Sequence, residues 1–386
     1  MKSLRMQCMA EQTDYGTAGQ TGLTVTLLDK MWEPLRQAMS DRLIPGASAA
    51  VLYKGERLRY AGGLAVDIPS ETTEATLETL YDCASLTKVS VTLPLVLILL
   101  DQGKLKLEDP VSSYLPEFHR ADKSMITLRH LLSHTSGFVA SYDFHTQPWT
   151  PQEILDFLAK EPLAYEPGTL CIYSDVGFIL LGEIIPRLFG MPLDQAAKKH
   201  LFDPLGMKDS GFRPSPGERP RIAATEYSMA TQAYWHGIVH DENARAMGGV
   251  SGHAGLFATA ADLLEYARMW LASANVRPSA AHKPCLLSPP AAVRAITKQT
   301  PLLPEVNRGL GWVLKGDTAD VSGRFFSQQA FGHTGFTGTS LYLDPLQELA
   351  VVLLTNRVHY GREQSVTQLR TDFHDAVAAA IQASSL

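Results

Sequence analysis

The sequence is poor in the features that mark several large classes of protein. Its four cysteines are scattered along 386 residues and form neither a C-x-x-C pair nor a Cys/His ligand spacing. We therefore expect free thiols in a reducing compartment, without a zinc site or a disulfide framework. The net charge of -6 supplies no basic patch for nucleic acid and no polybasic membrane anchor.

Long hydrophobic runs and targeting segments are also missing. The apolar run Val89–Leu100 has about 12 residues, fewer than the ~18 that a membrane-helix candidate needs. Residues 1–15 lack the apolar region of a signal peptide. With 45% hydrophobic and 19% charged residues, the composition predicts a globular, soluble protein, and the missing targeting segments lead us to expect a cytoplasmic protein without a membrane anchor.

The segment Ser85-Leu86-Thr87-Lys88 opens that apolar run. Residues three apart on a helix lie on the same face, and backbone N–H groups at a helix N-terminus favour negative charge. A hydroxyl, an amine and amide donors then meet at one place, as nucleophilic catalysis requires. The same spacing also occurs by chance as a solvated serine near a surface lysine, so the tetrapeptide decides nothing alone.

Two further segments complete a three-part pattern. Tyr173-Ser174-Asp175 precedes an apolar helix, and His333-Thr334-Gly335 lies on a predicted strand late in the chain. With Ser85 and Lys88, they resemble the ordered S-x-x-K, Y-x-N and K-T-G motifs of the penicillin-binding protein and serine β-lactamase superfamily. The resemblance is closest to the class C β-lactamase branch, with its family VIII carboxylesterases and D-peptidases, and covers about residues 25–380.

The resemblance implies a role for each motif residue. Ser85 matches the acylated nucleophile, Lys88 the lysine that helps to take its proton, and Tyr173 the base that later protonates the leaving group. The backbone N–H groups of Ser85 and Phe336 would form the oxyanion hole. The residues implied in substrate binding are Asp175, His333, Thr334 and Gly335.

Two positions depart from the family pattern. Asp175 replaces an asparagine, and an ionised aspartate only accepts hydrogen bonds; it is equally compatible with a plain helix N-cap. His333 replaces the lysine of K-T-G, and a neutral histidine does not attract a carboxylate as a fixed ammonium does. Substrates with a free carboxylate are therefore less favoured, and esters or neutral acyl groups become more plausible.

The prediction is a serine hydrolase that forms an acyl-enzyme on Ser85, with carboxylesterase as the first choice. A small ester or amide is the expected partner, and no cofactor or metal is expected. The alternatives are a D-amino-acid amidase or peptidase, a DD-peptidase-like enzyme on cell-wall fragments, an acyltransferase, a weak β-lactamase, and a catalytically silent ligand-binding member.

The periodicity of apolar residues predicts strands near both ends and helices between them. Predicted strands are Ala47–Tyr53, Arg57–Gly63, Gly309–Leu314, Ala330–Asp344 and Glu348–Asn356, the last two paired across Asp344-Pro345. Predicted helices are Leu23–Leu43, Leu128–Leu132, Pro151–Ala159, Val176–Phe189, Leu193–His200, Ala261–Ala272 and Gln364–Ile381.

These elements predict an α+β fold, with an antiparallel sheet from N- and C-terminal strands flanked by helices and a mostly helical second lobe. The resemblance implies that this fold is β-lactamase/transpeptidase-like. We expect a loose segment over residues 1–22 and one catalytic domain over residues 23–386. Its α/β lobe would comprise about residues 23–84 and 290–386, and its helical lobe about residues 85–289.

Other candidate residues have simpler interpretations. His134 and Ser136 are expected to be structural, and Cys83 to be a packing residue beside the site. His240–Asn243 is interpreted as a solvated loop at the rim of the cleft rather than a metal cluster, and Gly248–Gly255 as a buried turn near the site. Aromatic residues that would line an acyl pocket or belong to the core are Tyr142, Phe144, Trp149, Trp235 and Phe336.

Overall fold

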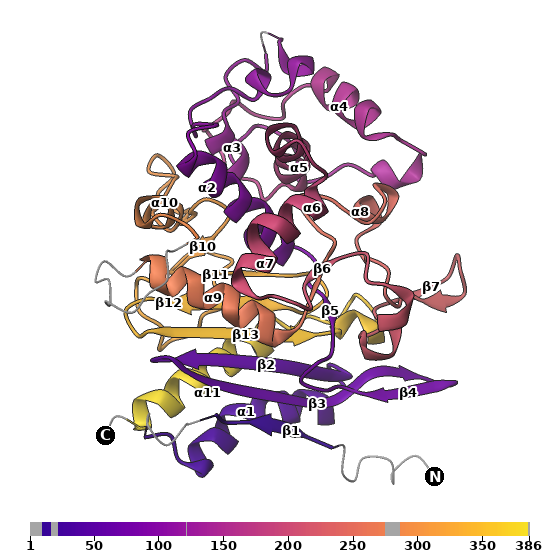
Figure 1. Ribbon diagram of the computed structural model, residues 1–386, viewed down its shortest axis with the longest axis vertical. Helices are drawn as coiled ribbons and strands as arrows, with labels where there is room; N and C mark the ends of the chain where they lie inside the picture. The colour runs from indigo at the N-terminus through magenta and orange to yellow at the C-terminus, as the bar shows by residue number, and fades with distance from the viewer. Residues whose placement is uncertain (1–9, 17–21, 121, 275–285, 385–386) are drawn as a thin grey trace.

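The computed structural model describes residues 10–16, 22–120, 122–274 and 286–384. A large sheet built from both ends of the chain lies below a lobe of helices and loops from the middle of the chain (Figure 1). The strands of the large sheet are β1 (Gln12–Asp14), β2 (Gly46–Tyr53), β3 (Glu56–Ile68), β4 (Glu71–Glu74), β10 (Val313–Leu314), β11 (Phe331–Thr334), β12 (Ser340–Asp344) and β13 (Leu349–Thr355).

The strand order is β1-β3-β2-β13-β12-β11-β10, with β4 paired to β3, and every pair is antiparallel. The N-terminal strand β2 pairs directly with the C-terminal strand β13 over the whole length of β13. This arrangement confirms the predicted α+β fold with an antiparallel sheet formed by both ends of the chain.

The continuous apolar run of β13 has a simple explanation, because both faces of the sheet are covered. Leu349, Val351 and Leu353 belong to the core on one face, whereas Val352 and Leu354 belong to the core on the other. Side chains alternate across a strand, so a strand that is buried on both faces needs apolar residues at every position.

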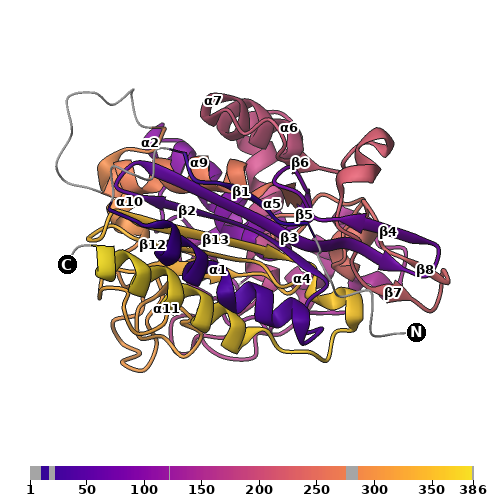
Figure 2. The ribbon, with the colours of Figure 1, turned by 90° about the horizontal axis from the view of Figure 1, so that it is seen from below.

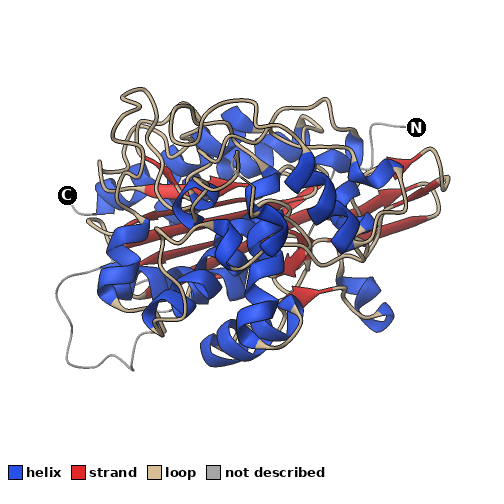
Figure 3. Ribbon diagram, turned by 90° about the horizontal axis from the view of Figure 1, so that it is seen from above, coloured by secondary structure: helices blue, strands red, loops and turns tan. Residues whose placement is uncertain are grey.

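Helices cover the two faces of the sheet. On one face α1 and α11 lie side by side (Figure 2), and on the other α9 packs on β13 and β2 beneath the helical lobe, which Figure 3 shows from above. The α-helices are α1 (Val25–Ser40), α2 (Leu93–Asp101), α3 (Leu128–Leu132), α4 (Pro151–Lys160), α5 (Asp175–Phe189), α6 (Leu193–Ala197), α7 (Asp203–Leu205), α8 (Glu242–Ala246), α9 (Ala260–Ala274), α10 (Pro289–Ala295) and α11 (Thr367–Ser384).

The remaining elements are short. One small sheet contains β5 (Tyr81–Asp82), β9 (Leu256–Ala258) and β6 (Gly211–Phe212), and a hairpin contains β7 (Tyr227–Ser228) and β8 (Ala233–Tyr234). Short 3₁₀ segments occupy Val111–Ser113, Pro116–Phe118, Phe144–Thr146, Pro216–Arg221 and Arg357–Tyr360, and π-helical turns occupy Lys88–Thr92 and Lys198–Phe202.

Several predicted boundaries are wrong. The single strand expected over Ala330–Asp344 is a hairpin of β11 and β12, because residues 335–339 form a turn in which Gly338 has a φ of +117°. The strand predicted over Gly309–Leu314 is reduced to β10. The N-terminal segment is not loose throughout, since β1 pairs with β3.

Other features of the organisation stay predictions. The lobe boundaries are untested, although α9, from within the predicted helical lobe, packs on the sheet. Cys8 and Cys285 lie outside the described residues, whereas Cys83 and Cys171 are free thiols. No single helix among the described residues has the length and apolarity to cross a membrane; α5 and the helical segment Leu193–Leu205, bent by 72° to each other, pass that test only as a pair.

Pro94 interrupts the apolar run behind Ser85 without breaking it. The chain winds as a π-helical turn over Lys88–Thr92 and continues as α2, with Pro94 in the first turn of that helix. The proline has no N–H to donate to the preceding turn, and the hydroxyl of the buried Tyr266 donates to the carbonyl oxygen of Val89. Tyr266 thus satisfies a backbone acceptor within the irregular turn.

Candidate active site

The turn that carries Ser85 is held by a buried carboxylate. Ser85 lies between β5 and the π-helical turn Lys88–Thr92. The Asp82 side chain accepts hydrogen bonds from the amides of Ala84 (2.8 Å) and His240 (2.6 Å). Ala84 has a φ of +46°, a left-handed conformation that costs about 1–2 kcal/mol for a residue with a Cβ. The strained residue directly precedes Ser85, so Asp82 fixes the orientation of the predicted nucleophile.

Lys88 is fully buried, and its ammonium has three partners. The Nζ lies 2.9 Å from the Ser85 Oγ, 2.8 Å from Asp175 Oδ1 and 3.2 Å from the carbonyl oxygen of His253. Burial by itself lowers the pKa of Lys88, but Asp175 and Tyr173 raise it above its ordinary value. Lys88 is therefore a cation that donates to Ser85 in this state.

Asp175 is the first residue of α5 rather than its N-cap. Ser174 occupies the N-cap position, and the Asp175 carboxylate pairs with Lys88 instead of capping the helix. The interpretation of Asp175 as a plain cap is therefore wrong. An asparagine here would not neutralise the buried ammonium, whereas the aspartate does so directly.

Tyr173 lies on a loop that His134 positions. The Ser174 amide donates to His134 Nδ1 over 3.1 Å, and the Ile172 amide donates to the His134 carbonyl oxygen over 3.0 Å. The His134 and Tyr173 rings lie 4.7 Å apart. Burial keeps the pKa of His134 well below its ordinary value, so the ring stays neutral and Nδ1 can accept. His134 thus has the structural role that the sequence predicts.

Tyr173 is 38% exposed, and the ring centroid lies 5.0 Å from the Lys88 Nζ and 5.8 Å from the His333 ring. The side chain therefore faces both the ammonium of the first motif and the histidine of the third. The structure brings the three predicted motifs into one place.

His333 is buried and presents an acceptor. Its Nδ1 lies 2.7 Å from the carbonyl oxygen of Thr334, and a carbonyl only accepts, so Nδ1 carries the proton. Burial, followed by the charges of Lys88 and Arg308, lowers the pKa of His333 to about 3. The ring is therefore neutral, and its Nε2 is an acceptor without a partner among the described residues.

Gly335 lets β11 approach the turn of the predicted nucleophile. A Cβ at this position would collide with Thr339 Oγ1 and would lie 2.5 Å from the carbonyl oxygen of Cys83. Cys83 is itself fully buried, in agreement with its predicted packing role. The amides of Ser85 and Phe336, on either side of this contact, donate no hydrogen bond within the described part of the chain. Their role as an oxyanion hole stays a prediction.

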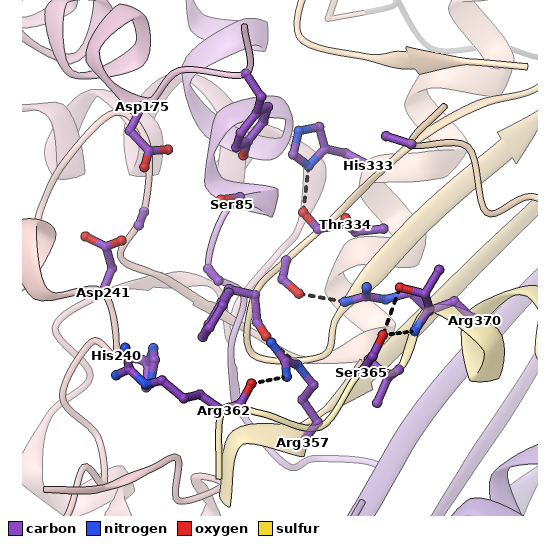
Figure 4. Close-up of a pocket in the computed structure, with 18 of the residues that line it drawn as sticks. Ser85, Asp175, His240, Asp241, His333, Thr334, Arg357, Arg362, Ser365 and Arg370 are labelled. Carbon is purple, nitrogen blue, oxygen red and sulfur yellow. Dashed lines mark hydrogen bonds between the residues drawn. The ribbon is translucent and has the colours of Figure 1, made fainter. Parts of the chain in front are cut away.

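The three motifs line one cavity of about 680 Å³. Figure 4 shows Asp175 and Asp241 on one side of Ser85, and His333, Thr334 and Arg370 on the other. The charged residues in the cavity wall are Asp175, Asp241, Glu242, Arg308, Arg357, Arg362, Glu363 and Arg370.

The arginines of the cavity differ in their partners. Arg308 pairs with Asp317, and Arg362 pairs with two glutamates. Arg357 and Arg370 donate to backbone carbonyls, among them Phe336 O (2.8 Å) and Gly335 O (2.6 Å), and have no carboxylate partner within the described ranges. Two buried positive charges therefore lie behind the turn that follows His333.

The segment His240–Asn243 is not the solvated loop that we predicted. His240 is 4% exposed, and Asp241 caps α8 by accepting from the Ala244 amide (2.7 Å). The Asp241 side chain also accepts from His253 Nε2 (2.9 Å). The segment therefore belongs to the wall of the cavity, and the structure extends the site to residues that the motifs did not include.

His253 reaches the site because the Gly-rich segment packs tightly on α5, as predicted for a buried turn. A Cβ at Gly252 would collide with the carbonyl oxygen of Phe178, and the Gly252 carbonyl accepts from Thr92 Oγ1 (2.6 Å). This packing brings the His253 carbonyl oxygen within hydrogen-bond distance of the Lys88 ammonium. The repeated glycines were the available sequence signal, but nothing in the sequence indicated which side chain they would bring to Lys88.

Asp175, Asp241 and His253 each offer a ligand atom, and these atoms lie within 4.8 Å of one another. The group has the ligand types of a metal site, but the Lys88 ammonium already lies 2.8 Å from the Asp175 carboxylate. Its charge would repel a divalent cation there, so the residues present do not fit a metal centre well.

Most of the aromatic residues proposed for an acyl pocket belong to the core. Phe144 and Trp149 pack edge to face with Phe157, and Tyr142 joins the same cluster. Of the five aromatic candidates, only Phe336 is found in the cavity wall.

Comparisons with known proteins agree with this geometry. The Beta-lactamase family matches residues 33–374. A relative from Salmonella agona (strain SL483), named "Putative D-alanyl-D-alanine carboxypeptidase", is 34% identical over 318 residues, which cover 74% of this chain and 71% of the relative.

Two solved structures share the fold. EstCE1, a hydrolase with promiscuous acyltransferase activity, is 23% identical with a TM-score of 0.75, over 94% of this chain and 100% of EstCE1. A class C β-lactamase is 22% identical with a TM-score of 0.72, over 94% of this chain and 98% of that protein. The chain therefore belongs to the Beta-lactamase family and is a hydrolase of the serine β-lactamase fold.

Proposed function

We propose that this chain is a serine hydrolase that works through an acyl-enzyme on Ser85, with carboxylic esters as its first substrate class. One arrangement carries the proposal: the Ser85 Oγ lies 2.9 Å from the buried Lys88 ammonium at the wall of an open cavity. A hydroxyl that is held by a cation and accessible to a substrate is a suitable starting state for nucleophilic acyl transfer.

In the first step, the Ser85 Oγ attacks the acyl carbon, and the bond from that carbon to the alcohol oxygen breaks. Lys88 is already protonated, so the Ser85 proton passes to Tyr173 in its phenolate form, and the resulting phenol gives that proton to the leaving alcohol. The amides of Ser85 and Phe336 stabilise the charge on the acyl oxygen. In the second step, water attacks the acyl-enzyme with Tyr173 as the base, and the acid is released as Ser85 recovers its proton.

The third motif supports esters as the first substrate class. A neutral His333 with a free acceptor nitrogen does not attract a carboxylate, whereas the lysine of K-T-G would. An ester substrate needs no cation at this position.

A D-peptide carboxypeptidase is the second candidate, because a different observation favours it. Arg357 and Arg370 carry positive charge behind the turn after His333 and lack carboxylate partners in the described chain. Such charges attract the free carboxylate of a peptide terminus. The name of the Salmonella relative agrees with this candidate.

The test measures hydrolysis of p-nitrophenyl butyrate and of a peptide that ends in D-alanyl-D-alanine. Ser85→Ala should abolish both hydrolysis and labelling by a fluorophosphonate, whereas Ser113→Ala, at an exposed serine, should retain them. Tyr173→Phe should slow acylation by about 10²–10⁴-fold. A Ser85→Ala variant with most of the wild-type activity would contradict the proposal.

Intact mass spectrometry after incubation with esters, D-amino-acid amides and a penicillin would distinguish the substrate classes. The added mass identifies the acyl group that remains on Ser85, and its decay gives the rate of deacylation. Wild-type protein without any adduct or fluorophosphonate label would instead indicate a silent ligand-binding member of the family.

A further inference from the structure

Two carboxylates of the cavity wall face each other beside the predicted nucleophile. Asp175 begins α5 and Asp241 caps α8, and their side chains are 23% and 30% exposed. A carboxylate oxygen of Asp175 lies within 4.8 Å of one of Asp241. Figure 4 shows both side chains on the same side of Ser85.

Each carboxylate has one oxygen that is already engaged and one that is free. Asp175 Oδ1 pairs with Lys88, and Asp241 Oδ1 accepts from His253 and the Ala244 amide. The two Oδ2 atoms have no hydrogen-bond partner within the described part of the chain. Both are therefore available to a donor in the cavity.

The neighbours of Asp241 keep its carboxyl group ionised. Burial by itself raises the pKa of Asp241, but the interactions with His253, the Ala244 amide and Lys88 hold it well below its ordinary value. The His253 ring lies between Asp241 and Ser251, with Nε2 2.9 Å from Asp241 Oδ1 and Nδ1 2.8 Å from the Ser251 hydroxyl. Lys88 forms its ion pair with Asp175.

A third acceptor lies in the same cavity. The His333 ring is 97% buried, and its Nε2 is a free acceptor without a partner among the described residues. This acceptor comes from β11, whereas the two carboxylates come from α5 and from the N-cap of α8. In the family pattern, the positions of His333 and Asp175 hold lysine and asparagine, which both supply donors. In this chain, the atoms that these two positions leave without a partner in the described chain, His333 Nε2 and Asp175 Oδ2, are acceptors.

We propose that Asp175 and Asp241 bind a protonated amine of the substrate, so that the preferred substrates are esters or amides of amino acids with a free α-amino group. The inference rests on the proposed acyl-enzyme function and specifies its substrate class. A charged N–H donor lies about 2.7–2.9 Å from a carboxylate oxygen, so one ammonium fits between two oxygens that are up to 4.8 Å apart.

The distance to the nucleophile agrees with an amine next to the acyl carbon. The Lys88 Nζ lies 2.9 Å from the Ser85 Oγ and 2.8 Å from Asp175 Oδ1, so the two oxygens are no more than about 6 Å apart. An α-amino nitrogen is separated from the acyl carbon by a single carbon atom. A substrate whose acyl carbon contacts Ser85 can therefore place its ammonium on Asp175.

The test compares the benzyl esters of D-alanine, L-alanine and propionic acid, which differ in the amine and its configuration. The release of benzyl alcohol is measured at pH 6.5, below the usual α-amino pKa of about 7.7–8.0. We expect the wild-type protein to show a kcat/KM at least tenfold higher for one alanine ester than for the propionate. Equal values for all three esters would overturn the inference.

The matched variant is Asp241→Asn, which keeps an oxygen for the helix cap and for His253 but removes the charge. The preference for the amine should fall by about 10–100-fold, as expected for the loss of a charge-assisted hydrogen bond. Asp203→Asn, at an exposed position outside the cavity wall, should keep the wild-type preference. An unchanged preference in Asp241→Asn would also overturn the inference.

The outcomes separate this inference from the proposed function. If the wild-type protein cleaves the propionate as well as the alanine esters and Ser85 is labelled by a fluorophosphonate, the function stands and the ammonium site fails. If no ester is cleaved and Ser85 is not labelled, the function itself fails. A preference for the amine that requires an added divalent cation and disappears with a chelator would replace the ammonium with a metal and overturn the inference.

Discussion

His374 provides a direct test of how acid affects the hydrophobic core between the large sheet and helices α1 and α11. The residue lies on α11, is fully buried and contacts Val321 O through Nδ1 at 2.7 Å, and its ring lies 4.9 Å from that of Tyr342. Burial lowers the pKa of His374 to about 4. Because His374 is outside the cavity wall, its effect on stability is separable from catalysis.

The sign of the effect follows from proton binding. An unfolded histidine has a pKa of about 6.5, so between pH 6.5 and 4 the unfolded chain binds more protons at His374 than the folded chain does. The contribution of His374 to stability is therefore complete above pH 6.5 and decreases as the pH falls toward 4. Between pH 7 and pH 5, one such group reduces the free energy of unfolding by about 2 kcal/mol.

The variant is His374→Asn, because an asparagine amide can donate to Val321 without titrating. Urea unfolding gives the free energy of unfolding of wild type and variant at pH 7 and pH 5. The variant should lose about 2 kcal/mol less than the wild type over this range, whatever its stability at pH 7. His119→Asn, at an exposed site, is the control and should follow the wild type. Equal losses in wild type and His374→Asn would refute the reasoning.

Two further predictions concern the third motif. Gly335→Ala places a Cβ against Thr339 and the Cys83 carbonyl, so β11 must move. We expect kcat/KM for p-nitrophenyl butyrate to fall by about 10²–10³-fold. A fall below threefold would contradict the predicted oxyanion hole. The pKa of His333 is about 3, so the pH profile of kcat/KM between pH 5 and 9 should keep its shape in His333→Asn. A displaced acid limb in that variant would show that His333 titrates in this range.

The central strands could be predicted because both faces of the sheet are buried. β2 and β13 consist of apolar and small residues at every position, which is typical of strands covered on both sides. The edges could not be predicted in the same way. β1 is formed by the polar residues Gln12–Asp14, whose pairing with β3 depends on backbone hydrogen bonds rather than on side-chain hydrophobicity.

The candidate site was predictable where its chemistry is local or belongs to a motif. Ser85 and Lys88 meet because they are three residues apart in one turn. The sequence placed the segments of Asp241 and His253 near the cleft but did not predict their contacts with the site, because these depend on long-range packing that no local pattern records. The turn at Gly252 packs against α5 more than 70 residues away, and only the folded chain shows that this brings a carbonyl to the ammonium.

The two departures from the family motifs have a joint consequence for charge. With lysine at position 333 and asparagine at position 175, two ammonium groups and no carboxylate would come from these motifs. In this chain, the neutral His333 removes one positive charge and Asp175 adds one negative charge, so the motif residues are more negative by two.

This change affects the reaction as well as substrate binding. Asp175 raises the pKa of Lys88, which makes Lys88 a poor base; in the proposed mechanism, Tyr173 therefore takes the proton of Ser85. The same carboxylate, with Asp241, favours a cationic substrate group near Ser85. In this proposal, Asp175 both keeps Lys88 charged and contributes to the ammonium site, so one residue of the second motif links the protonation state of the site to its specificity.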